Sequence, residues 1–339
     1  MCQMYVFGGG NSFYWDRACQ AGTFGSHAEG GEDMSGMHRH RMKHKRSMIQ
    51  LLSAVLLNGY MIGFRNGKIY TGKAKAVCVP VLNCYSCPGA LGACPVGALQ
   101  AAVGGGKGHV PFYVLGILML FGVVLGRVVC GFLCPFGFVQ DLLYKIPVPK
   151  LHVPKKIDRP ARYLKYVVLL AAVILLPVSA AAKTGAAVPY FCKYICPAGT
   201  LGGALPLMGA DPVLRDLTGT LFDWKLFVLA VVLILSMLIS RPFCRYLCPL
   251  GAFYALFNRF SFFQMQLDQT KCTGCRACER VCPMEVEVTR NINSAECIRC
   301  GKCKGACPTG AISSGFGNKE GTSEPGNEAS GKKERRIPE

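Results

Sequence analysis

The sequence is poor in charged residues, because Asp, Glu, Lys and Arg together make up only 17% of its 339 residues. Soluble globular chains carry about a quarter charged residues, so this deficit argues against an entirely soluble protein. Hydrophobic residues make up 51% of the chain, and they are concentrated in separate stretches. This distribution predicts membrane-spanning helices.

The motifs of several common cofactors are also missing. No histidine lies in any of the apolar stretches, which excludes a haem held by two histidines within the membrane. There is no G-x-G-x-x-G followed by the acidic residue of a dinucleotide site, and segment 104–107 lacks the first glycine and the Ser or Thr of a P-loop. We therefore expect no nucleotide or flavin site, and we expect electrons to come from a protein partner or from membrane quinol.

Negative charge is scarce relative to positive charge, since 19 acidic residues stand against 38 basic ones and the net charge is +19. Most of the Lys and Arg residues lie in short stretches that flank apolar segments. There they interact with anionic lipid headgroups and set the orientation of the chain. We therefore interpret the charge as membrane anchoring and predict no nucleic-acid partner.

Cysteine, in contrast, is abundant, and two runs near the C-terminus share the spacing C-x2-C-x2-C-x3-C-P. This spacing is typical of ferredoxins with two [4Fe-4S] clusters, in which the fourth cysteine of each run ligates the other cluster. The predicted ligands are Cys272, Cys275, Cys278 and Cys307 for one cluster, and Cys297, Cys300, Cys303 and Cys282 for the second. Zinc sites also use C-x2-C pairs, but two matching runs that each end in Cys-Pro favour iron–sulfur clusters.

Four apolar stretches, at 48–64, 110–129, 163–182 and 226–240, predict transmembrane helices. About 20 residues are needed to cross the hydrocarbon core, and the first and last stretches are short by this measure. Basic residues crowd the start of the first stretch and the segment between the second and third. The positive-inside rule then places both termini and the ferredoxin module on the cytoplasmic side of a bacterial-type inner membrane.

The membrane part contains an internal repeat, because R-x-x-C-x3-C-P-x-G occurs at 127–137 and again at 241–251. Each copy supplies two cysteines, whereas a four-iron cluster needs four thiolates. Two parallel two-helix repeats, related by an axis along the membrane normal, bring both copies together. The predicted inner site consists of Cys130, Cys134, Cys244 and Cys248. The alternative is that these cysteines are small apolar residues at helix ends, with the prolines as turn residues.

A further group of cysteines lies in the loops predicted to face outside. These candidate outer-site residues are Cys84, Cys87, Cys94, Cys192 and Cys196. Three interpretations stay open for them: a metal or cluster site, thiol–disulfide chemistry in an oxidising exterior, or a structural role.

The predicted fold class is a mostly α membrane protein with a small α+β ferredoxin domain of the bacterial two-cluster type. The predicted divisions are a disordered basic segment at 1–47, a membrane domain at 48–262, a ferredoxin domain at 263–313 and a disordered tail at 314–339. The two halves of the membrane domain cover about 48–150 and 160–262. The two end segments are assigned as disordered because they are rich in small and polar residues.

Four spans, C-x3-C-P motifs after the second and fourth, and a C-terminal eight-cysteine module resemble the NapH-type membrane-bound polyferredoxins over residues 48–312. NosR-type regulators and the CcoG assembly factor share the C-x3-C-P motif. The resemblance implies a quinol dehydrogenase component, or an electron conduit between the quinone pool and a redox protein partner that carries an iron–sulfur cluster or a cytochrome haem.

We therefore expect an integral membrane electron-transfer protein that passes electrons between quinol or an outer site and cytoplasmic [4Fe-4S] clusters. It would hold two clusters in the ferredoxin domain, one at the inner site and, as a candidate, one at the outer loops. One alternative is a redox-linked assembly or regulatory protein that acts on a metal or a disulfide through its outer cysteines. Another is a structural subunit with static clusters. No catalytic residue is predicted.

Overall fold

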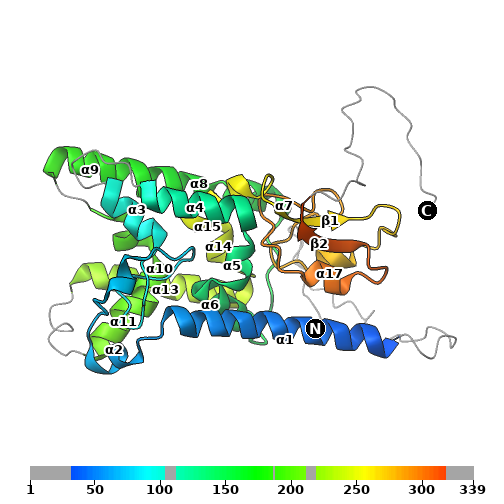
Figure 1. Cartoon of the computed structure of the whole chain (residues 1–339), viewed down its shortest axis with the longest axis horizontal. Helices are drawn as coiled ribbons and strands as arrows, with labels where there is room; N and C mark the ends of the chain where they lie inside the picture. Colours follow the sequence, from blue (N-terminus) through cyan, green and yellow to red (C-terminus); the bar gives the residue numbers. More distant parts are fainter. Residues whose placement is uncertain (1–31, 104–111, 186–187, 211–218, 318–339) are drawn as a thin grey trace, which may run out of the picture.

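The computed structural model describes residues 32–103, 112–185, 188–210 and 219–317, and these are mostly helical. A bundle of helices occupies one end and the middle of the molecule, and a small two-stranded sheet with short helices occupies the other end (Figure 1). The predicted disorder of residues 1–31 and 318–339 lies outside the described residues.

A long first helix connects the two parts. Helix α1 (Glu32–Leu57) runs beside both the bundle and the sheet end, and it contacts helices of each part (Figure 1). The prediction of disorder over 1–47 is therefore wrong for residues 32–47. This stretch is rich in Met, Arg and Lys, which have high helix propensity. Near its end, Arg46 attaches the helix to the bundle by donating to Gly131 O over 3.1 Å.

The first predicted span, 48–64, is not one helix. Helix α1 ends at Leu57, and a short helix α2 (Met61–Asn66) follows. Asn58 and Gly59 separate them, and both residue types have low helix propensity.

The second predicted span, 110–129, contains only the 14-residue helix α4 (Phe112–Leu125). Gly126 ends it with a left-handed backbone conformation, at φ 57°, and its N–H bonds to Gly122 O over 2.9 Å. A glycine adopts this conformation without steric cost, so the chain turns here before the next short helix begins.

Two helices of the described residues are long and apolar enough to cross a membrane. They contain the third predicted span and the fourth except for its last two residues. They are the 30-residue helix Lys155–Thr184 and the 19-residue helix α13 (Thr220–Leu238). Only 33% and 17% of their most apolar windows are buried inside the molecule. The first is subdivided into α7 (Lys155–Ala161), α8 (Leu164–Val168), the π-helical segment η3 (Leu169–Leu175) and α9 (Leu176–Thr184). The π-helical segment ends just before Pro177, whose missing N–H interrupts the regular bonding pattern.

Shorter helices fill the space between these long ones. They are η2 (Lys73–Ala76), α3 (Pro95–Val103), α5 (Val128–Phe132), α6 (Pro135–Leu143), η4 (Phe191–Ile195), α10 (Pro197–Gly199), η5 (Thr200–Ala204), α11 (Leu205–Ala210), α14 (Pro242–Tyr246) and α15 (Pro249–Phe257). Four of them, α3, α6, α10 and α15, begin at the proline of a Cys-Pro pair.

The ferredoxin part is closed by an antiparallel pair of strands, β1 (Phe263–Leu267) and β2 (Ile312–Phe316). Two short helices, α16 (Ala277–Arg280) and α17 (Lys302–Ala306), each follow the first two cysteines of a run. Strand β2 continues to Phe316, so the prediction of a disordered tail is wrong for residues 314–316. Along the sequence, β1 precedes the first cysteine run and β2 follows the second, so both runs lie between two strands that pair with each other.

Candidate iron–sulfur sites

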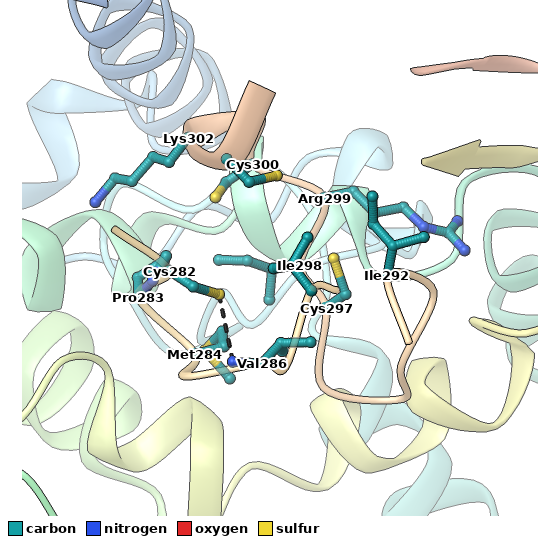
Figure 2. Close-up of a pocket in the computed structure, with 12 residues that line it drawn as sticks. Cys282, Pro283, Met284, Val286, Ile292, Cys297, Ile298, Arg299, Cys300 and Lys302 are labelled. Atoms are coloured by element: carbon teal, nitrogen blue, oxygen red, sulfur yellow. Dashed lines mark hydrogen bonds between the residues drawn. The ribbon is translucent and has the colours of Figure 1, made fainter. Parts of the chain in front are cut away.

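Four cysteines of the ferredoxin part line one cavity. Cys282, Cys297, Cys300 and Cys303 all line it, and Figure 2 shows the first three of them around Ile298. This set is the one that the sequence predicts for the second cluster. Met284, Val286 and Ile298 form the apolar wall of the cavity and are almost fully buried.

The backbone of both cysteine runs turns in the same way. In each run, the residues before and after the second cysteine have positive φ. The values are 71° for Gly274, 54° for Arg276, 50° for Arg299 and 73° for Gly301. Alternating conformations of this kind direct successive backbone N–H groups to one side, which favours an anionic group there. Near the end of the first run, Val286 N donates to Cys282 Sγ over 3.5 Å (Figure 2).

The set predicted for the first cluster comes together in part. Cys272, Cys278 and Cys307 border one hydrophobic cluster that includes Met265. Cys275, the remaining predicted ligand of this cluster site, is exposed. Cys303 borders this hydrophobic cluster as well as the cavity, so the two ferredoxin sites share a wall.

The four cysteines of the predicted inner site also line one cavity. Cys130, Cys134, Cys244 and Cys248 line it, two from each half of the chain. Cys130 lies on α5 and Cys244 on α14, and the other two immediately precede α6 and α15. The structure thus brings the two copies of the repeat together.

The repeated C-P-x-G segment explains how two of these thiols are oriented. Cys134 and Cys248 are the N-cap residues of their helices, with proline in the first turn. Gly137 N donates to Cys134 Sγ and Gly251 N to Cys248 Sγ, each over 3.4 Å. A helix N-terminus offers free N–H groups and a positive dipole end, so it stabilises a thiolate at this position.

The arginines of the repeat cross from one half to the other. Arg127 Nη2 donates to Cys244 O over 3.3 Å, and Arg241 Nη1 donates to Cys130 O over 2.8 Å. Both guanidinium groups are fully buried. Burial raises the pKa values of the Cys130 and Cys244 thiols, and the two arginines act in the opposite direction. The site therefore offers positive charge to a set of thiolates.

Both of these arginines have a carboxylate partner. Arg241 forms two bonds with Asp141, from Nε over 2.8 Å and from Nη2 over 2.6 Å, and Arg46 of α1 also pairs with Asp141 over 2.6 Å. Arg127 pairs with Glu296 of the ferredoxin part over 3.0 Å. The arginines hold the pKa of Asp141 well below its usual range, against the effect of burial.

The inner cavity and the ferredoxin cavity are adjacent. Ile298 lines the ferredoxin cavity, and a Cβ added to Gly131 would lie 2.5 Å from Ile298 O. Gly131 directly follows Cys130, which packs against the apolar wall of the ferredoxin cavity. Arg127 spans the same boundary, since it donates to Ala295 O over 2.8 Å.

A buried glutamine that sequence reasoning missed completes the inner site. Gln140 is fully buried, and its Nε2 donates to Cys244 Sγ over 3.1 Å. It lies on α6, six residues after Cys134. The signal was present in the sequence, because Gln140 follows a run of apolar residues and a buried amide side chain needs a hydrogen-bond partner.

Four of the five outer cysteines come together at a different place. Cys84, Cys94, Cys192 and Cys196 interact with one another, the Cys87 thiol donates to Asn58 Oδ1 instead, and Cys78 is buried in the core. Every cysteine of the described residues is a free thiol. Within the same residues, no three His, Cys, Asp or Glu side chains converge on a point where one metal ion would be held. The cysteines line spaces instead, and their donor chemistry suits a multi-atom iron–sulfur cluster.

Comparison with known proteins gives the family. A family model described as a 4Fe-4S binding domain matches residues 108–154, 166–205 and 221–265, and one described as a 4Fe-4S dicluster domain matches 264–308. Two uncharacterized proteins of Methanocaldococcus jannaschii are each 34% identical, over 58% and 60% of this chain and 68% and 78% of their own lengths. The ferredoxin-type protein NapH of Haemophilus influenzae is 30% identical over 56% of this chain and 63% of its own length.

No solved structure matches the chain. The two family models cover both copies of the C-x3-C-P repeat and the two cysteine runs. The chain belongs to the family of 4Fe-4S ferredoxin-type polyferredoxins and is an iron–sulfur electron-transport protein.

Proposed function

We propose that this chain is an integral membrane protein that conducts single electrons between its ferredoxin sites and the inner four-cysteine site. The observation that carries the proposal is the cavity lined by Cys130, Cys134, Cys244 and Cys248, which abuts the ferredoxin cavity at Gly131. When bound, a [4Fe-4S] cluster supplies a one-electron couple.

The residues around the two cavities perform three tasks. The cysteines hold and space the sites, and the apolar side chains of Val81, Leu82 and Ile298 exclude water from the cavity walls. Arg127 and Arg241 supply positive charge beside the thiolates of the inner site. Burial and hydrogen bonds to sulfur are the protein's main means of adjusting a cluster potential.

Exposed apolar surface supports the membrane location. Beyond the two long helices, Leu52 and Leu56 on α1 and Phe112 and Leu120 on α4 are exposed. Apolar patches of this extent on a folded chain mark a surface that meets another apolar phase. We infer that α1 and α4 lie in the membrane beside the two long helices, although each is too short in its apolar part to span it alone.

The basic loop between the predicted second and third spans supports the orientation. Lys155 pairs with Glu287 of the ferredoxin part over 2.7 Å, and Arg162 donates to Met284 O over 3.1 Å. The ferredoxin part thus lies on the side of the most basic loop, which is the cytoplasmic side under the positive-inside rule.

We further propose the membrane quinone pool as one electron partner and a redox protein with an iron–sulfur cluster or haem as the other. This part of the proposal is supported by the likeness to NapH-type polyferredoxins alone. The rival function is a redox-linked assembly or regulatory protein that acts on a metal or disulfide through the outer cysteines.

The test begins with the full chain purified anaerobically in detergent, with iron and acid-labile sulfide measured per chain. Cys244→Ser should remove about four irons, because it opens a site that needs four thiolates. Cys78→Ser is the matched control, since Cys78 is a buried thiol of the core outside the inner site. Equal iron in both variants would overturn the inner site.

The second measurement addresses the electron partner. The wild-type chain in lipid nanodiscs is mixed with a quinol, and cluster reduction is followed by freeze-quench electron paramagnetic resonance. Reduction that is lost in Cys244→Ser supports the conduit. Reduction by quinol that persists in this variant, together with loss of function when the outer cysteines are changed to serine, would favour the rival.

A further inference from the structure

We infer that Cys84, Cys94, Cys192 and Cys196 form a second four-cysteine site, suited to a [4Fe-4S] cluster, from which Cys87 is excluded. The proposed conduit uses only the ferredoxin and inner sites, so this site goes beyond it. Its ligands come in pairs from the two halves of the chain, as they do in the inner site.

Two glycines show how closely the four cysteines approach one another. A Cβ added to Gly199 would lie 3.6 Å from Cys84 Sγ and 3.9 Å from Cys196 Sγ. A Cβ added to Gly97 would lie 3.8 Å from Cys192 Sγ and 4.0 Å from Cys94 Cβ. Each glycine therefore meets cysteines from both halves, and the absence of a side chain leaves room beside the sulfurs.

The electrostatic interactions tie the two pairs into one group. Burial, together with the neighbouring thiols of Cys94 and Cys84, raises the pKa of the Cys192 thiol to about 12. The pKa of Cys196 is raised well above its ordinary value by burial and by Cys192, Cys84 and Cys94. These interactions agree with the glycine distances above, which place thiols of both pairs near one another.

The site repeats the C-P-x-G arrangement of the inner site. Cys94 directly precedes α3 and Cys196 directly precedes α10, and both helices begin with proline. Gly97 and Gly199 stand three residues after these two cysteines, as Gly137 and Gly251 do in the inner site. One thiol of each half is thus held at a helix start in both sites.

A buried glutamine is repeated as well. Gln100 is fully buried, its Nε2 donates to Cys192 Sγ over 3.4 Å, and its Oε1 accepts from Phe191 N over 3.0 Å. Like Gln140 in the inner site, it lies six residues after a Cys-Pro cysteine of the first half and reaches a cysteine of the second half. Two sites with the same donors in the same relation indicate the same type of ligand.

Cys87 points elsewhere. Its thiol donates over 3.6 Å to Oδ1 of Asn58, a residue outside the group of four cysteines. Burial raises the pKa of this thiol, and among the other cysteines Cys84 alone adds to that rise.

The second site lies close to the inner site, on the side away from the ferredoxin part. Leu82 lines the inner cavity and Cys84 is two residues further, so extended chain of roughly 7 Å at most joins them. Tyr254 is fully buried between the sites and donates to Pro80 O over 2.9 Å. Helices α3 and α10 lie farther from the sheet than α5 and α14 (Figure 1).

The test compares single serine variants of the full chain, purified anaerobically in detergent. Four occupied sites correspond to about sixteen irons per wild-type chain. Cys192→Ser should lower this by about four and change the electron paramagnetic resonance spectrum, whereas Cys87→Ser should leave both unchanged. The double variant Cys130→Ser/Cys192→Ser should lose about eight irons per chain, because the inner site and the second four-cysteine site are separate.

A second variant keeps the inference testable if Cys192→Ser fails to fold. Gln100→Leu retains all four thiols but removes the N–H bond to Cys192, so iron should be unchanged. At a fixed potential, the ratio of reduced to oxidised cluster should fall about fivefold for the cluster bound to Cys192. Only one of the electron paramagnetic resonance signals should therefore change. The inference is overturned if Cys87→Ser loses as much iron as Cys192→Ser, or if Gln100→Leu shifts no signal.

Discussion

Glu296→Gln should loosen the contact between the ferredoxin part and the bundle. Glu296 pairs with Arg127 over 3.0 Å and also with Lys165, and both cations are fully buried. The glutamine has nearly the same shape but no charge, so two buried cations lose their counter-charge. Removing one partner of a buried ion pair costs about 3–5 kcal/mol. A local opening equilibrium should therefore become at least about 100-fold more favourable, since 1.4 kcal/mol is a factor of ten.

Hydrogen exchange measured by mass spectrometry reports this opening, because the Cys297 amide is protected by its bond to Ser294 O over 2.9 Å. Glu287→Gln is the matched control: its partner Lys155 is mostly exposed, and exposed pairs contribute less than about 1 kcal/mol. Exchange around Cys297 should accelerate at least about 100-fold in Glu296→Gln and less than about fivefold in the control. Equal acceleration in both variants would refute the reasoning.

Three further changes test the inner site. Gly131→Ala places a methyl group against Ile298 O and should destabilise the chain by about 1–3 kcal/mol, seen as a lower thermal midpoint; an unchanged midpoint would mean that the two cavities are not in contact. Gln140→Leu removes the donor to Cys244 Sγ and should lower the midpoint potential of one cluster by about 40 mV in a redox titration, with iron content unchanged. Asp141→Asn leaves two buried arginines without their carboxylate and should make α1 accessible to protease, whereas persistent resistance would argue against the pairing.

The cysteine sets show what spacing alone can predict. Cys282, Cys297, Cys300 and Cys303 follow from one local pattern, and the structure brings them to one cavity. The inner set required a second inference, that two copies of a two-cysteine motif must meet to supply four thiolates. The structure places these cysteines together too, and what binds there stays a prediction.

Other features depend on contacts that a single sequence does not reveal. The break after Leu57 and the turn at Gly126 shorten two predicted spans, because hydropathy averages over residues that end a helix. The crossing of Arg127 and Arg241 to opposite halves is a tertiary contact between residues far apart in the chain. The outer loops contained five cysteines, and only the fold separates Cys87 from the other four.

The crossed arginines also set an order of events during biogenesis. A chain synthesised only as far as the first half has Cys130 and Cys134, but its Arg127 lacks the Cys244 carbonyl that accepts its bond. The cavity comes into being only when residues up to Cys248 have been made and packed against the first half. Iron and sulfide can then be inserted into the inner site only after translation of both repeats, so its loading is a late step of maturation that a truncated first repeat would never reach.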